Sequence, residues 1–183
     1  MEKLRIFISS TMEDLREERI AVANAINRNR TWEPVYAESF VARSESPREV
    51  CLEEVRKSHI YIGIFKEWYG YIPQDNNPQG DSVVVLEYKE ARNNHLPIFI
   101  FIDKSSSNRE KRLTEFLSEI TGFDRGHWRK EYSTTDELVQ FAIEAINFEI
   151  ARGYLQHIQD KQKKEVQSIY SLPYFEKLKE RLK

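Results

Sequence analysis

Cysteine is almost absent from this sequence of 183 residues, in which Cys51 is the only one. A single cysteine cannot form an internal disulfide or a zinc cluster, and its scarcity fits a reducing, cytoplasmic environment. No apolar run approaches the roughly 20 residues that a membrane-spanning helix needs, and the N-terminus does not read as a signal peptide. The net charge is only −2, so no basic surface is indicated. We therefore expect a cytoplasmic protein that binds neither nucleic acid nor membranes.

Several motifs that mark sites in α/β proteins are also missing. No Gly-x-x-x-x-Gly-Lys sequence follows an apolar run, which excludes a phosphate-binding P-loop. The first candidate loop has no glycine and no acid, which argues against a dinucleotide-binding Rossmann turn and against a phospho-receiver. The Gly-x-Ser-x-Gly elbow of serine hydrolases is absent. The four histidines show no metal-ligand spacing, so we expect neither a metal nor a bound cofactor.

What the sequence does contain is a strand, a polar loop and a helix near its start, LRIFISSTMEDLREER (4–19). Residues 4–8 predict a short buried strand, and Met12 is expected to open a helix that runs to about residue 29. Three hydroxyl residues stand between them: Ser9, Ser10 and Thr11. Capping of the helix accounts for one hydroxyl and leaves two spare. Ligands collect at such loops, beyond the carboxyl ends of parallel strands, so this loop is the first place to look for a site.

Apolar strands alternate with amphipathic helices along the chain. The predicted strands cover 4–8, 33–37, 60–65 and 97–102, with a weaker fifth at 131–133. This alternation predicts an α/β fold with a flavodoxin-like, doubly wound parallel sheet of strand order 2-1-3-4-5 and a crevice between strands 1 and 3. Beyond Gly153 the composition turns polar. We therefore expect an α/β domain over residues 1–152 and a helical extension or tether over 153–183.

Two charged residues fall on the apolar faces of predicted helices. Arg19 follows Leu15 by one turn, and an inward guanidinium needs a carboxylate such as Glu87 or Glu38, or a ligand. Glu87 lies on the inward face of the helix predicted over 82–95. Trp68 and Tyr69 lie near the start of the irregular stretch 66–81. Two roles suit them equally well: their rings could pack over the end of the sheet, or they could stack on a ligand.

Hydroxyls, one inward carboxylate and aromatic rings at one crevice suit the cleavage of an N-glycosidic bond. A carboxylate stabilises or traps the oxocarbenium-like state of such a reaction. Hydroxyls hold ribose oxygens, and aromatic rings stack on the base. The residues alone thus suggest cleavage of an N-glycosidic bond.

A resemblance strengthens this interpretation. FISSTMEDLREER, SPREVCLEEVRKSHIYIGIFKEWYG and LEYKEARNNHLPIFIFI resemble a bacterial and metazoan family of unknown function. The signature of that family is an F-I-S-S-T-x-x-D-L-x-x-E-R opening, Y-G after the third strand and a glutamate-bearing helix before a Pro-initiated strand. The family is grouped with the Toll/interleukin-1 receptor (TIR) and nucleoside 2-deoxyribosyltransferase superfamily, and the resemblance spans residues 4–103.

This resemblance implies that Glu87 is the catalytic group, because the superfamily's glutamate lies on the helix after the third strand. The Glu-x-Gly-x-Ala pattern of the transferases is echoed over 87–91, with Lys89 in place of glycine. The TIR Trp-Cys pair before the glutamate is missing, and His59 replaces the aspartate that often opens the third strand. We expect the substrate to be bound by Ser9, Ser10, Thr11, Arg19, Glu38, Trp68, Tyr69, Gly70 and Ser82.

The sequence thus predicts a TIR-like effector or signalling domain of bacterial defence that binds a nucleotide, a nucleoside or NAD, cleaves the N-glycosidic bond of NAD and forms a homo-oligomer. One alternative is a non-catalytic module that self-associates, and a second is base exchange as in nucleoside deoxyribosyltransferases. A cavity that contains Glu87, Arg19 and the hydroxyls would favour an enzyme. Glu87 in a structural ion pair with no cavity would favour the non-catalytic module.

Overall fold

The computed structural model describes residues 2–170. Five parallel strands form one sheet in the order β2-β1-β3-β4-β5, which confirms the predicted α/β class and strand order. The strands are β1 (Leu4–Ser9), β2 (Trp32–Val35), β3 (Ile60–Phe65), β4 (Ile98–Asp103) and β5 (Arg129–Tyr132). The order changes direction between β1 and β3, so loops that leave these two strands diverge and open a crevice at their carboxyl ends.

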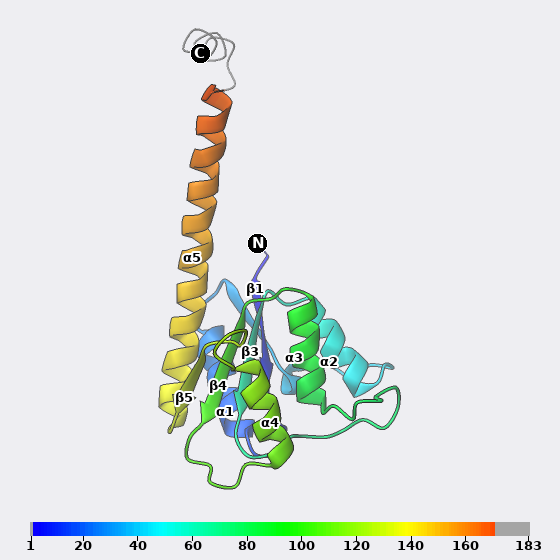
Figure 1. Cartoon of the computed structure of the whole chain (residues 1–183). Helices are drawn as coiled ribbons and strands as arrows, with labels where there is room; N and C mark the ends of the chain where they lie inside the picture. The colour runs from blue at the N-terminus through cyan, green and yellow to red at the C-terminus, as the bar shows by residue number, and fades with distance from the viewer. Residues whose placement is uncertain (1, 171–183) are drawn as a thin grey trace. The chain divides into compact units, whose positions relative to one another are not determined.

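Four helices connect successive strands, and a fifth follows the last strand (Figure 1). They are α1 (Arg16–Asn27), α2 (Pro47–Arg56), α3 (Val83–Asn93), α4 (Lys111–Ile120) and α5 (Thr135–Tyr170), with a short 3₁₀ turn, η1 (Ala37–Ser39), after β2. The start of α2 follows from the sequence. The Ser46 hydroxyl oxygen accepts a hydrogen bond from the Glu49 amide, the Glu49 carboxylate accepts one from the Ser46 amide, and Pro47 occupies the first helical position.

The core fixes α3 against the middle of the sheet. All six residues of β3 are buried, as expected of a central parallel strand. The ring of Tyr88 packs edge-on against Tyr61 of β3 and Phe116 of α4, with ring centroids 6.4 and 5.3 Å apart. Such pairs add specific geometry to the burial of apolar surface. Because Tyr88 is anchored in this way, the position of α3, and with it the backbone of Glu87, is fixed against the sheet.

The prediction that Met12 opens the first helix is wrong, since α1 begins at Arg16. The carbonyls of Thr11 and Met12 accept hydrogen bonds from the Arg19 guanidinium, at 2.8 and 3.1 Å. The Thr11 hydroxyl donates to Asp14, and no side chain caps α1. The loop hydroxyls therefore do not serve as helix caps. Residues 12–15 form turns that Arg19 organises from within the helix that follows.

Other boundaries differ from the prediction by a few residues. β2 ends at Val35 because the chain turns into η1 over residues 37–39, and β5 begins two residues earlier than expected. The predicted helical extension is confirmed as far as residue 170, where the described part of α5 ends. The chain divides into two compact units, Met1–Ala145 and a second that begins at Ile146; the predicted boundary at 152/153 stays a prediction. None of the described helices is long and apolar enough to cross a membrane.

Candidate active site

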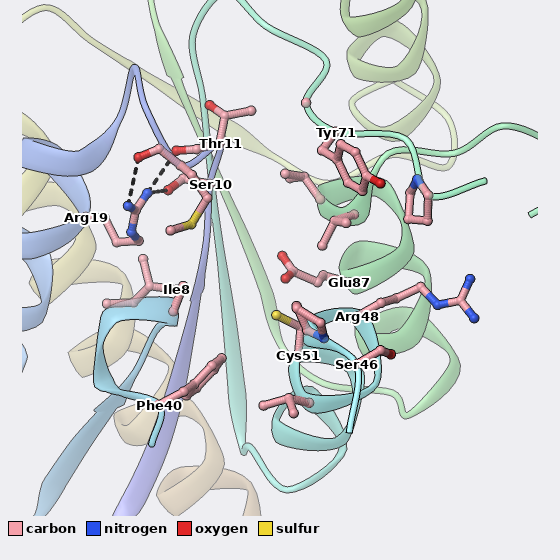
Figure 2. Close-up of a pocket in the computed structure, with 18 of the residues that line it drawn as sticks. Ile8, Ser10, Thr11, Arg19, Phe40, Ser46, Arg48, Cys51, Tyr71 and Glu87 are labelled. Carbon is pink, nitrogen blue, oxygen red and sulfur yellow. Dashed lines mark hydrogen bonds between the residues drawn. The ribbon is translucent and has the colours of Figure 1, made fainter. Parts of the chain in front are cut away.

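A cleft of about 1390 Å³ opens at the carboxyl ends of β1 and β3. Its walls come from the β1–α1 loop, the segment from η1 to α2, the loop after β3, and α3. Figure 2 shows Ser10, Thr11 and Arg19 on one side and Glu87 with Cys51 on the other. The cleft lies at the switch point of the strand order, where ligands bind in open parallel sheets. The sequence prediction of a crevice at this place is confirmed.

Glu87 is the buried carboxylate of this cleft. It lies in the second turn of α3 and is 6% exposed, with its carboxylate directed into the cavity (Figure 2). The Ser9 hydroxyl donates a hydrogen bond of 2.5 Å to Oε2 of Glu87. Among residues 2–170, no cation forms an ion pair with this carboxylate. A carboxylate in this setting is costly to ionise.

Burial raises the pKa of the Glu87 carboxyl to about 7. Three neighbours oppose this effect by favouring the ionised form: Ser9, Cys51 and Arg19. Burial and the charge of Glu87 in turn raise the pKa of the Cys51 thiol well above its usual range. Glu87 is therefore poised between its two protonation states near neutral pH, which is a common property of catalytic carboxyls.

Arg19 is buried and paired with a carboxylate, as its position on the apolar helix face predicts. It is 1% exposed, and its Nε donates to Glu38 at 2.8 Å while Nη2 contacts the other Glu38 oxygen. Of the two predicted partners, Glu38 is thus the one observed. The hydrogen bond from Arg19 holds the pKa of Glu38 below its ordinary value. This pair ties η1 to α1 and shapes one wall of the cleft.

The three predicted hydroxyls have three different partners. Ser9 donates to Glu87, Ser10 accepts a 2.6 Å hydrogen bond from Arg19, and Thr11 donates to Asp14. Ser10 and Thr11 line the cleft, whereas Ser9 is buried beneath its floor.

The aromatic residues after β3 divide between the cleft and the core. Trp68 lines the cleft with 45% of its surface exposed, while Tyr69 is buried in the core with the Arg112 guanidinium 4.4 Å from its ring centre. Gly70 lines the cleft with φ of 93°, and a β-carbon there would come within 3.2 Å of Thr11 Cγ2. This turn brings Tyr71, 74% exposed, to the cleft instead.

Ser82, the last of the predicted binding residues, lies in the interior at the start of α3. It is fully buried, and its hydroxyl has no hydrogen-bond partner within the part of the chain that the structure describes.

Sequence reasoning assigned no role in the site to several residues that line it, of which Cys51, Arg48, Phe40 and Tyr71 are the clearest. The inward position of Cys51 on α2 could have indicated from the sequence that it lines the site. Tyr71 belongs to the same aromatic run as Trp68, but its direction depends on the turn at Gly70, which periodicity does not reveal. Among the described residues, no cluster of histidine, cysteine and acids could hold a metal ion.

The comparisons with known proteins agree with this fold. The model of a family described as "Domain of unknown function (DUF4062)" matches residues 5–147. The chain belongs to this family. Among solved structures, the TIR domains of the activated Roq1 resistosome, which directly recognises the pathogen effector XopQ, align with a TM-score of 0.53 and 13% identity over 79% of this chain and 99% of that chain. That likeness shows a TIR-like fold.

A second solved structure, the CMP N-glycosidase BcmB of Clostridium botulinum, aligns with a TM-score of 0.47 and 12% identity, over 74% of this chain and 94% of that chain. No curated protein matches the sequence.

Proposed function

We propose that the cleft binds NAD and that Glu87 promotes cleavage of the N-glycosidic bond between its ribose and nicotinamide. The observation that carries this proposal is a buried carboxylate that pairs with no cation of residues 2–170 and is directed into a cleft at the switch point of the sheet. A structural glutamate in the same place would be expected to pair with a nearby arginine. The charge of Arg19 acts on the Glu87 carboxyl, yet its ion pair is with Glu38.

The chemistry requires one carboxylate and one water. The bond between C1′ and the pyridinium nitrogen breaks, and its electron pair stays on that nitrogen, so nicotinamide leaves as a neutral molecule. The ionised Glu87 stabilises the cationic C1′ that develops or bonds to it transiently. Water then adds to C1′ and releases a proton, which yields ADP-ribose, nicotinamide and H⁺.

The surroundings of Glu87 favour a leaving group that already carries a positive charge. A neutral base must be protonated by a second acid as it departs, whereas nicotinamide in NAD needs no proton. Within the described residues, the side chains that shift the pKa of Glu87 are Ser9, Cys51 and Arg19, so no second carboxyl group acts on Glu87 itself, although Glu13, Glu45, Asp75 and Glu110 also line the cleft. Trp68 and Tyr71 supply exposed ring faces at the cleft on which the bases of a dinucleotide can stack.

The TIR-like fold supports a place in signalling or defence. The Roq1 TIR domains belong to an activated resistosome, and an assembly of several copies would suit a domain of this kind. We accordingly propose that the chain acts as a homo-oligomer.

The test is the incubation of the chain with NAD over a wide range of protein concentrations, with nicotinamide and ADP-ribose separated by chromatography. Glu87→Gln is expected to lower the rate by at least about 10²- to 10³-fold, since the developing cation loses its stabilising charge. Glu90→Gln is the matched control, because Glu90 lies on the same helix but pairs with Arg56 at 2.6 Å.

Neutral nucleosides and CMP, with and without a free base, are assayed in parallel. Cleavage of these substrates in preference to NAD would replace the proposed substrate, and base exchange would indicate a transferase. An inert wild-type chain at every concentration, or full activity in Glu87→Gln, would overturn the proposal in favour of a non-catalytic module.

A further inference from the structure

Two small neutral donors take the place that a cation would occupy beside a buried carboxylate. Ser9 at the end of β1 donates to Oε2 of Glu87 at 2.5 Å, and the Cys51 thiol of α2 faces the same carboxylate (Figure 2). We propose that Ser9 and Cys51 are positioning residues that keep Glu87 ionised and fixed in the cleft. The catalytic meaning of this pair rests on the proposed cleavage by Glu87, whereas its effect on the carboxylate can be measured without any activity.

The burial of Ser9 indicates that its hydroxyl acts on Glu87 and not on a ligand. Ser9 is 1% exposed and lies beneath the residues that line the cleft, so a substrate would not reach its hydroxyl directly. Its hydrogen bond joins the end of β1 to the middle of α3, across 78 positions of the sequence. A hydrogen bond to an ionised group is among the stronger ones in proteins and restricts the carboxylate to one orientation.

Cys51 approaches from a different element and has a different chemistry. Its thiol is a weak donor on α2, half-buried and in contact with the cleft. Burial and the charge of Glu87 keep the Cys51 pKa far above neutral, so the thiol retains its proton. A protonated thiol can donate to Glu87, and it adds no negative charge that would oppose ionisation of the carboxyl.

The other groups that face Glu87 do not donate a hydrogen bond to its carboxylate. From α1, Arg19 favours the ionised form through its charge, but its hydrogen bonds go to Glu38, Ser10 and backbone carbonyls. From β3, Tyr61 is buried, and burial together with the charge of Glu87 raises its pKa, so it stays neutral. The ionised form therefore depends on the direct hydrogen bond from Ser9 and on the nearby protonated thiol of Cys51.

The test follows the ionisation of Glu87 itself by ¹³C NMR of glutamate-labelled protein, in which the Glu87 signal is assigned by its loss in Glu87→Gln. In wild type the titration midpoint is expected near pH 7. Ser9→Ala should raise the midpoint by about 1 to 2 on the pH scale, because a hydrogen bond to the charged form is lost. Cys51→Ala should raise it by less, and Cys51→Ser should restore it, since serine keeps a donor.

Ser58→Ala is the matched control, because Ser58 is also a buried serine but donates to the backbone carbonyl of Glu54. Its midpoint should equal that of wild type. If Ser9→Ala does not fold, Cys51→Ala and Cys51→Ser decide the question from another element. Unchanged midpoints in the folded variants would overturn the inference.

The same variants separate this inference from the proposed function. If wild type cleaves NAD, the rise of the rate with pH should move to higher pH by the same amount as the midpoint in each variant. If wild type is inert toward NAD but the midpoints move, the positioning role stands and the proposed function fails. If wild type is active but neither the midpoints nor the pH profile move, the positioning role fails and the proposed function stands.

Discussion

Two glutamates of neighbouring helices are buried to almost the same degree but lie in opposite electrostatic settings. Glu54 of α2 is 5% exposed, and its carboxylate binds Arg5 at 2.6 Å and Arg43 at 2.7 Å. Glu87 of α3 is 6% exposed; among residues 2–170 its carboxylate accepts a hydrogen bond from Ser9 and lies near the Cys51 thiol, with no cation paired to it. Burial alone therefore does not single out a functional acid. What distinguishes Glu87 is a buried charge that the fold leaves uncompensated beside a cavity.

The two settings serve different purposes. The arginines around Glu54 join β1 and the segment before α2 to the helix, so this carboxylate connects three parts of the chain. The setting of Glu87 connects β1 to α3 through one short hydrogen bond and leaves the carboxylate reachable from the cleft. In the proposed reaction, a cation that develops in the cleft would be the positive charge that pairs with the ionised Glu87. This interaction would offset the free energy spent on burying the carboxylate.

The first way to sharpen this comparison is to measure the stability of Glu87→Gln as a function of pH. The pKa of Glu87 is raised from 4.5 to about 7 by folding, so its contribution to stability is full below 4.5 and is lost as the pH rises through 7. The difference corresponds to roughly 3 kcal/mol. Relative to wild type, Glu87→Gln should therefore gain up to about 3 kcal/mol between pH 4.5 and pH 8.

Urea unfolding at several pH values measures this gain, and Glu90→Gln on the same helix should show no such trend. A flat difference between wild type and Glu87→Gln across this range would mean that the buried carboxylate is compensated after all.

The second prediction concerns the compensated glutamate. Glu54→Gln should lower the free energy of unfolding by about 2 kcal/mol at neutral pH, because Arg5 loses a charged partner in a mostly buried position. The cost is below that of a fully buried pair, since Arg5 keeps about a quarter of its side chain exposed and still binds Glu33. NAD cleavage, where present, should persist in this variant.

Glu53→Gln is the matched control for Glu54→Gln. Glu53 is the adjacent residue of α2, but its side chain is 42% exposed and pairs with Lys57 at the surface. Its replacement should change stability little. Equal losses in the two variants would show that burial does not set the importance of these pairs.

The sequence predicted the fold well because its signals are local. Apolar runs such as 60–65 and capping residues such as Ser46 and Pro47 determine their elements with little help from the rest of the chain. The start of α1 was predicted wrongly for the opposite reason. Arg19 binds the carbonyls of Thr11 and Met12, and this contact depends on where the side chain folds back.

The site was predictable in part. The inward positions of Arg19 and Glu87 followed from helical periodicity, and both residues line the cleft. Glu38 was one of the two partners predicted for Arg19, but the choice between them, like the choice of Ser9 for Glu87, depends on contacts between distant segments. The direction of Tyr69 and Tyr71 likewise depended on the backbone turn at Gly70, which sequence spacing does not define.

The last prediction uses the single cysteine as a reporter of the Glu87 charge. Cys51 lines the cleft, so a small alkylating reagent can reach it, but burial and Glu87 raise its pKa. Because the thiolate is the reactive form, Cys51 should react at pH 8 much more slowly than a free cysteine. Glu87→Gln should accelerate the reaction several-fold, since it removes the negative charge while burial, the larger cause of the raised thiol pKa, remains.

Mass spectrometry of the intact chain measures the rate of Cys51 alkylation without interference from other thiols, because the sequence has none. Glu90→Gln should leave the rate unchanged. Equal rates in wild type and Glu87→Gln would show that the carboxylate does not act on the thiol, and the contrast with Glu54 would then rest on Ser9 alone.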